Sequence, residues 1–253
     1  MRPGASRQRH ADRKSAAVLL LVGLMVAAPC GTRAGDQEDP RSIVASAVRA
    51  AGGRSALARY PARVWKEKAV YHGTDGDERY EASYVAAWPD KIRVVIGDFT
   101  LAVNGDKGWV RTRDATRDMT REELEEHAEG AYSVWVLSLL PLESDEFSLS
   151  PLRDASFAGA PTTGINVSHR GHFDIQLYFD RKTSLLAMSR TRYKEARSGK
   201  EVAQETFFSG YESESGIKTP TTISIRRDGK LAVEASVETR YLTERDERVF
   251  AKP

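Results

Sequence analysis

The sequence has almost no cysteine: Cys30 is the only one among 253 residues. A chain with one thiol cannot form an internal disulfide, so its folded domain needs a core large enough to be stable without covalent cross-links. Motifs for common chemistry are also missing. The sequence contains no nucleophile elbow of the G-x-S-x-G type and no glycine-rich loop suited to cradling phosphates. We therefore expect no enzyme activity, no catalytic residues and no cofactor.

Two histidines are close enough in sequence to raise the question of a metal site. His169 and His172 flank Arg170-Gly171, which is typical of a hairpin turn. No carboxylate or thiol at ligand spacing completes a set of metal ligands around them. The pattern predicts two exposed turn histidines and no metal site.

The chain has one apolar run at its start, and it is short. Basic residues precede the 13-residue run Ala16–Ala28, and Thr32-Arg33-Ala34 offers small side chains at the −3 and −1 positions. A run of this length is too short to cross a bilayer comfortably. The pattern predicts a signal peptide at residues 1–34 and export to the periplasm; a short membrane anchor is the alternative.

The basic character of the chain belongs to this leader. Residues 1–34 contain six basic residues and one acidic residue, so their removal changes the formal charge from +2 to −3. A mature chain with this charge balance gives no support to nucleic-acid binding. We expect no nucleic-acid partner.

Cys30 leaves a second possibility for the leader. Cleavage before an acylated Cys30 would anchor the protein as a lipoprotein. A lipobox has a small residue just before the cysteine and a leucine three residues before it, whereas this chain has Pro29 and Ala27. Anchoring through Cys30 is therefore kept as the alternative location.

Alternation of apolar and polar residues predicts a mainly β domain over residues 35–253. Phe173–Phe179 and Leu231–Val237 show the period of two that is typical of half-buried antiparallel strands. We predict a strongly curved antiparallel sheet, an incomplete barrel, with twelve strands. The predicted strands are Arg63–His72, Asp77–Trp88, Lys91–Ile96, Phe99–Asn104, Trp109–Thr112, Phe147–Ser150, Gly164–His169, His172–Asp180, Leu185–Lys194, Val202–Phe208, Thr221–Arg227 and Leu231–Leu242.

Two long helices are predicted beside these strands. Asp39 as N-cap and Pro40 at the first position begin a helix over about 40–51, which Gly52-Gly53 ends. The capping box at 120–123 begins a second helix over about 121–140, which Gly130 could break into two pieces. Residues 243–253 are predicted to form a polar tail.

The predicted sheet has more apolar surface than two helices can cover. Ten strands about 20 Å long and about 4.8 Å apart present on the order of 1,000 Å² per face. Two helices of about 15–20 residues cover on the order of 500–600 Å². The excess favours an internal apolar cavity; a core filled by side chains is the alternative.

The order of several short segments resembles the LolA/LolB-like superfamily of periplasmic lipoprotein carriers. The resemblance covers most of the mature chain and rests on the leader, the first helix, the meander and the mid-chain helix. The segments that carry it are Trp88–Arg93, Val103–Trp109, Phe179–Leu186, Gly216–Pro220 and Asp228-Gly229.

The resemblance implies an incomplete barrel around a helical lid, with an apolar cavity between them. In the carriers this cavity takes lipoprotein acyl chains; in related proteins it takes other lipids or serves an envelope-stress sensor. The carriers usually have a lid-latching arginine before the strand-turn proline, where this chain has Trp88. Tryptophan cannot make the hydrogen bonds of arginine, which argues against a lid that cycles between two states.

We therefore expect non-catalytic binding of lipid or lipoprotein acyl chains by a carrier or chaperone. Envelope lipoprotein-transport components are the further class of partner. The alternative is an envelope-stress sensor or a regulatory interaction protein. For the aromatic candidates among the residues below, ordinary packing in the core is the alternative to lining a cavity. The candidate residues of the cavity and lid are Trp65, Tyr84, Trp88, Ile92, Val94, Leu101, Val103, Trp109, Tyr132, Trp135, Val136 and Leu139.

Overall fold

The structure is a computed structural model that describes residues 38–253. The predicted signal peptide and Cys30 lie outside the described residues. Within residues 38–253, every helix is too short or too polar to cross a bilayer.

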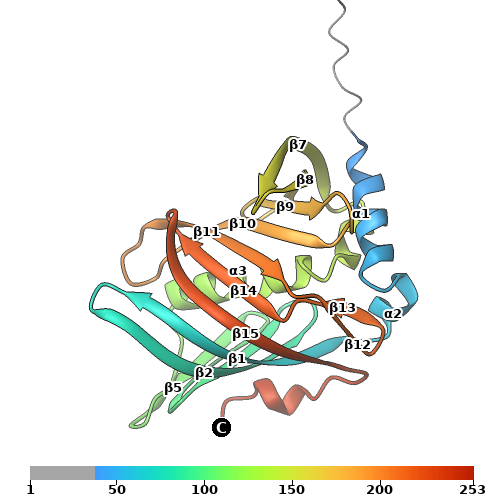
Figure 1. Ribbon diagram of the computed structural model, residues 1–253. Coiled ribbons are helices and arrows are strands. Elements are labelled where there is room, and N and C mark those ends of the chain that lie inside the picture. The colour runs from blue at the N-terminus through green and yellow to red at the C-terminus, as the bar shows by residue number, and fades with distance from the viewer. Residues whose placement is uncertain (1–37) are drawn as a thin grey trace, which may run out of the picture. The chain divides into compact units, whose positions relative to one another are not determined.

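Thirteen strands form one antiparallel sheet, in the order β6-β5-β4-β3-β2-β1-β15-β14-β11-β10-β9-β8-β7. The edge strands β6 and β7 do not pair with each other, so the sheet is curved but not closed into a barrel (Figure 1). Its strands are β1 (Ala62–Gly73), β2 (Gly76–Ala87), β3 (Lys91–Ile96), β4 (Phe99–Asn104), β5 (Lys107–Arg111), β6 (Thr116–Asp118), β7 (Ser148–Phe157), β8 (Ala160–Ser168), β9 (Ile175–Asp180), β10 (Leu186–Lys194), β11 (Glu201–Ser209), β14 (Thr222–Arg227) and β15 (Lys230–Leu242).

The remaining elements are short. A separate two-stranded sheet pairs β12 (Glu212–Glu214) with β13 (Ile217–Thr219). The helices are α1 (Pro40–Ala50), α2 (Arg54–Ala58), α3 (Arg121–Val136) and the 3₁₀ helices η1 (Leu140–Glu143) and η2 (Glu247–Phe250).

The mainly β architecture predicted from the sequence is confirmed. Each of the twelve predicted strands overlaps an observed strand. The three strands that were not predicted, β6, β12 and β13, have three residues each, too few to display an alternating pattern.

The predicted N-terminal caps of both long helices are present, but the second helix ends earlier than predicted. Asp39 accepts hydrogen bonds from the backbone N–H groups of Arg41 and Ser42, and the capping box at Thr120 is formed with Glu123. α3 continues through Gly130 without a break and ends at Val136. It stops earlier than predicted because Leu139 adopts a left-handed conformation, with φ of 71°, before η1 begins.

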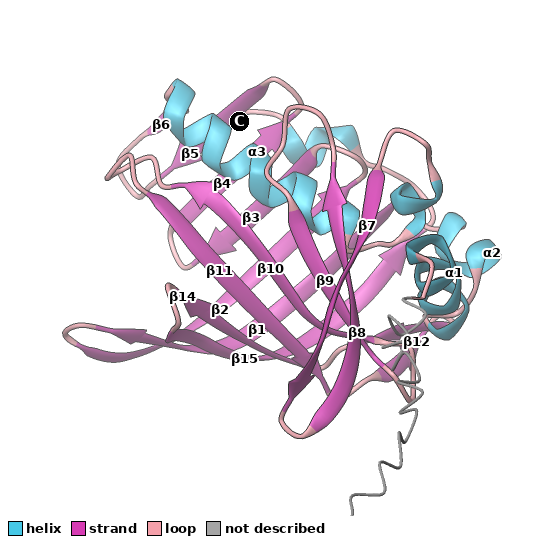
Figure 2. Ribbon diagram, turned by 90° about the horizontal axis from the view of Figure 1, so that it is seen from above, coloured by secondary structure: helices cyan, strands magenta, loops and turns pink. Residues whose placement is uncertain are grey.

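α3 lies across the concave face of the sheet (Figure 2). It contacts β3 and β4 in one arm of the sheet and β10 in the other. The helix therefore bridges the two arms, and the central strands β1, β15 and β14 lie between them in the strand order.

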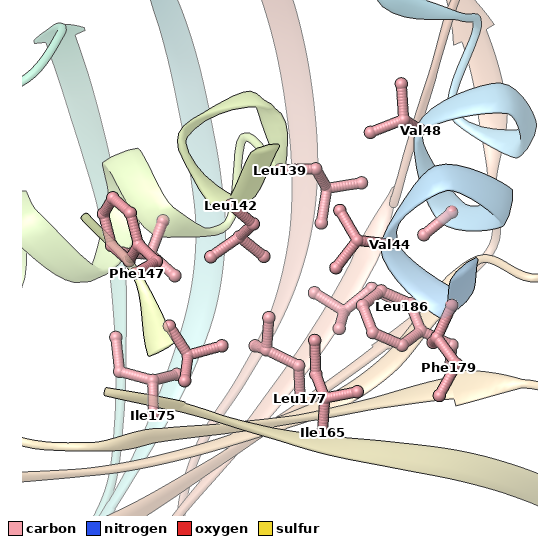
Figure 3. Close-up of a cluster of buried hydrophobic side chains, with 14 of the residues drawn as sticks. Val44, Val48, Leu139, Leu142, Phe147, Ile165, Ile175, Leu177, Phe179 and Leu186 are labelled. Carbon is pink, nitrogen blue, oxygen red and sulfur yellow. The ribbon is translucent and has the colours of Figure 1, made fainter. Parts of the chain in front are cut away.

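A second part of the concave face is filled by α1 and η1. Val44 and Val48 of α1 belong to one buried cluster with Leu139, with Leu142 of η1 and with side chains of β8, β9 and β10 (Figure 3). Ile165, Leu177 and other residues of this cluster are fully buried. This end of the sheet has a solid apolar core.

The C-terminal segment covers the opposite face of the sheet. Phe250 of η2 is 1% exposed and packs with Ala62 and Ala87. Its carbonyl oxygen accepts a hydrogen bond of 2.9 Å from Nε1 of Trp109. The expectation of a polar tail is wrong for this segment, because Phe250, with Val249 beside it, packs against the sheet.

The packing of η2 predicts that Phe250→Ala lowers the free energy of unfolding by about 3 kcal/mol, since the change leaves a cavity against the sheet. Urea denaturation measures the loss. Arg248→Ala is the control within the same turn, because Arg248 pairs only with the exposed side chain of Asp246; it is expected to change stability by less than about 0.5 kcal/mol. Equal effects of the two changes would contradict the assigned anchor.

Candidate functional site

A cavity of about 860 Å³ lies between α3 and the inner face of the sheet. Its volume is near the upper end of the range of about 300–1,000 Å³ that is common for small-molecule sites. The apolar residues that line it come from central strands, from α3 and from the segments that follow α1 and α3. They include Leu57, Trp65, Tyr84, Trp88, Ile92, Val94, Leu101, Val134, Trp135, Leu137, Leu139, Leu140, Leu186, Phe208, Ile223, Ile225, Val233 and Val237.

Strand register explains how two large aromatic residues reach the cavity together. Trp65 of β1 is paired directly with Tyr84 of β2, and both side chains point to the inner face. Their rings stack with centroids 4.6 Å apart and planes 1° from parallel. The pair forms a flat apolar surface on the cavity floor.

Eight of the twelve candidate residues named from the sequence line this cavity. They are Trp65, Tyr84, Trp88, Ile92, Val94, Leu101, Trp135 and Leu139. Whether any of them contacts a ligand stays a prediction.

The other four candidates lie elsewhere. Val103 is fully buried beside Ala131, and Val136 is fully buried in the α1 cluster. Trp109 faces the opposite side of the sheet and donates to Phe250. Tyr132 stacks on His172, with ring centroids 3.6 Å apart. Packing against α3 closes Val103 off from the cavity, whereas Trp109 and Tyr132 were named for their aromatic side chains and lie in other contacts.

The two turn histidines are not exposed, which corrects the sequence-based expectation. His169 and His172 are half-buried, and both rings stack on Tyr132 of α3. Nδ1 of His172 also lies 2.8 Å from Oε1 of Glu129. The β8–β9 connection therefore fastens α3 to one arm of the sheet.

A second fastening holds α3 nearer its N-terminus. The backbone N–H of Ala196, in the β10–β11 connection, donates a hydrogen bond of 2.7 Å to Oε2 of Glu126. Trp88 takes no part in such a tie, because its Nε1 donates instead to the carbonyl oxygen of Tyr60, 3.0 Å away. The position that would carry the lid latch of a carrier thus packs the cavity wall.

Charged groups inside the cavity are the feature that sequence reasoning missed. Glu67 is 7% exposed, and its two oxygens accept hydrogen bonds of 3.0 Å from Nε1 of Trp65 and from the hydroxyl of Tyr84. Burial raises the pKa of Glu67, and these two bonds and the charge of Arg63 oppose the shift only in part. Burial likewise raises the pKa of Tyr84, with the nearby Glu67 as the next cause.

The signal for these residues was present in the alternating pattern. Arg63, Trp65, Glu67 and Ala69 fall at every second position of β1, so they share one face. Two charged residues at inward positions are unusual in a strand whose other inward residues are apolar. Such residues mark a polar feature of an otherwise apolar interior.

Within residues 38–253, no group of three or more His, Cys, Asp or Glu residues is placed to hold a metal ion. The walls instead offer apolar surface and a few buried polar groups. This arrangement can remove an apolar molecule from water and orient a polar end.

Comparison with known proteins shows the fold. No family model matches the chain, and no curated protein matches it by sequence. Among solved structures, a LolA superfamily protein from Nitrosomonas europaea matches with a TM-score of 0.57 and 11% identity. A DUF1329 family protein from Desulfovibrio piger matches with a TM-score of 0.59 and 13% identity. A putative outer membrane lipoprotein-sorting protein domain from Vibrio parahaemolyticus matches with a TM-score of 0.54 and 11% identity.

Each of these matches covers 85% of this chain and 98% of the other chain. The fold of this protein is LolA-like, as the resemblance implied.

The burial of Glu67 predicts a pH-dependent stability. An acid with a higher pKa in the folded protein than in the unfolded one binds more protons when folded, between the two pKa values. The free energy of unfolding therefore falls as pH rises through this interval, by up to about 1.4 kcal/mol per pH unit for one proton. Glu67→Gln should remove this pH-dependent part of the free energy of unfolding. Above the interval, the variant should be at least as stable as the wild-type protein.

Urea denaturation between about pH 4 and 8 measures the effect. Glu81→Gln is the matched control on β2, because Glu81 is exposed; it should keep the pH slope of the wild-type protein. An unchanged slope in Glu67→Gln would show that the Glu67 carboxyl does not carry the raised pKa.

Proposed function

We propose that this protein binds an acyl chain in the cavity beneath α3 and acts as a carrier or chaperone for a lipid or a lipidated protein. The single observation that supports this function is the cavity itself, a space of about 860 Å³ with largely apolar walls. An empty apolar cavity of this size costs free energy, because the side chains that line it lack packing contacts. An apolar ligand that fills the cavity restores those contacts.

The fold supports an envelope role. One of the similar structures is described as a putative outer membrane lipoprotein-sorting protein domain, and another as a LolA superfamily protein. Together with the predicted signal peptide, this likeness leads us to propose a periplasmic location. The proposed partners are lipids, lipoprotein acyl chains and the envelope components that deliver or receive them.

Burial of methylene groups would supply the binding free energy. Each methylene removed from water contributes about 0.8 kcal/mol, so ten buried methylenes contribute about 8 kcal/mol before the cost of association. The role we propose is non-catalytic, because binding and release by burial need no reacting group.

Native mass spectrometry of protein purified from a bacterial envelope without detergent tests the proposal. We expect a co-purifying lipid, because a cavity with apolar walls would hold its ligand through purification. The matching solution measurement is displacement of a fluorescent fatty acid. A protein that arrives without lipid and binds no fatty acid would overturn the proposal and favour the regulatory alternative.

A cavity-filling variant is the sharper test. Val94 and Val95 are adjacent half-buried residues of β3, but only Val94 lines the cavity. Val94→Trp should reduce fatty-acid affinity at least about tenfold, because the indole occupies the space of the chain. Val95→Trp, on the opposite face, should leave affinity unchanged. Equal affinities in the two folded variants would contradict binding in this cavity.

A further inference from the structure

Arg63 lies on the inner face of β1, at the wall of the cavity. It is paired with Ala86 of β2 and with Tyr241 of β15. Its guanidinium carbon is 4.6 Å from the ring centroid of Trp65 and 5.7 Å from that of Trp88. Two indole rings therefore hold the guanidinium in place, and the surface that it leaves accessible lines the cavity.

Arg63 has no ion-pair partner among residues 38–253. Nε of Arg63 is buried without a hydrogen-bond partner. An arginine stays protonated in a protein, so a buried guanidinium without a counter-charge is costly.

Glu67 does not fill that role. Both of its oxygens already accept hydrogen bonds, from Trp65 and Tyr84. Glu67 acts on Arg63 only through space, since the two side chains form no ion pair.

The other charged residues that line the cavity are mostly basic. Five basic side chains line it against three acidic ones. Two of the acidic residues, Glu126 and Glu129, are engaged in fastening α3. The other four basic residues, Arg192, Lys218, Arg227 and Arg245, are exposed to solvent. Arg63 is therefore the cation that an anion would meet in the interior of the cavity.

We propose that Arg63 binds the anionic head of the ligand, so that the cavity selects a single-chain lipid with a terminal carboxylate or phosphate monoester. This inference rests on the proposed function, since the same cavity must hold the chain. The planar guanidinium matches both oxyanions, and its terminal N–H groups are the donors that would face their oxygens.

Displacement of a fluorescent fatty acid by four probes tests the selection. The probes are palmitate, hexadecyl phosphate, hexadecanol and acetate. Wild-type protein should bind palmitate or hexadecyl phosphate about 10- to 100-fold more tightly than hexadecanol, the gain expected for a charge-assisted hydrogen bond. Comparison of palmitate with hexadecyl phosphate identifies the head. Acetate should not compete, because it has no chain to bury.

Arg63→Met should remove the preference for the anionic probes and leave the affinity for hexadecanol unchanged. Methionine keeps much of the apolar volume of the side chain between the two indole rings. The matched control is Arg192→Gln. Arg192 also lines the cavity, but it already pairs with Glu201 at 2.8 Å, so this change should preserve the preference.

The outcomes separate the two proposals. If no long-chain probe binds the wild-type protein, the proposed function fails. If hexadecanol binds as tightly as palmitate and hexadecyl phosphate, or if Arg63→Met keeps the anionic preference, only the role of Arg63 fails. If acetate competes at the same concentration as palmitate, Arg63 belongs to a site for small anions, and the proposal that it binds the head group of a lipid is wrong. A role of Arg63 in packing alone would not alter head-group selectivity.

Discussion

The internal space of this protein depends on how one helix meets one sheet. α3 touches the sheet at β3 and β4 on one side and at β10 on the other, so it bridges the curved sheet. The strands between these contacts, β1, β15 and β14, contribute Trp65, Val237 and Ile223 to the cavity floor. A helix is about 10 Å wide and cannot span two arms and also fill the space between them. The cavity follows from this geometry.

The polar groups of the cavity acquire their properties from the same enclosure. In a site of low dielectric, an acid without a cation in contact with it shifts toward its neutral form, as Glu67 does. A guanidinium has no accessible neutral form, so Arg63 keeps its charge and is held by the faces of two indole rings. Arg63 is thus a cation without an ion-pair partner on a largely apolar wall, and it gives the cavity a chemical preference as well as a volume.

Much of the architecture could be predicted from the sequence because its signals are local. Alternation located all twelve of the longer strands, and the caps at Asp39 and Thr120 located both long helices. The partition of the inner face could not be predicted, because it depends on which strands a helix reaches. Val103 and Leu101 alternate identically on β4, yet Val103 is closed off beside Ala131 while Leu101 lines the cavity. The burial of Phe250 and of the two turn histidines also depends on contacts distant in sequence.

A hollow interior requires that stability come from elsewhere, and this protein has two such sources. At one end of the sheet, α1 and η1 pack a solid cluster against β8, β9 and β10. On the outer face, η2 packs Phe250 over β1 and β2. The first cluster borders the cavity through Leu139 and Leu186, and the second lies on the outer face of the sheet. Most of the buried residues in these two clusters do not line the cavity. The apolar contacts of these clusters offset the free-energy cost of burying the Arg63 guanidinium without an ion-pair partner.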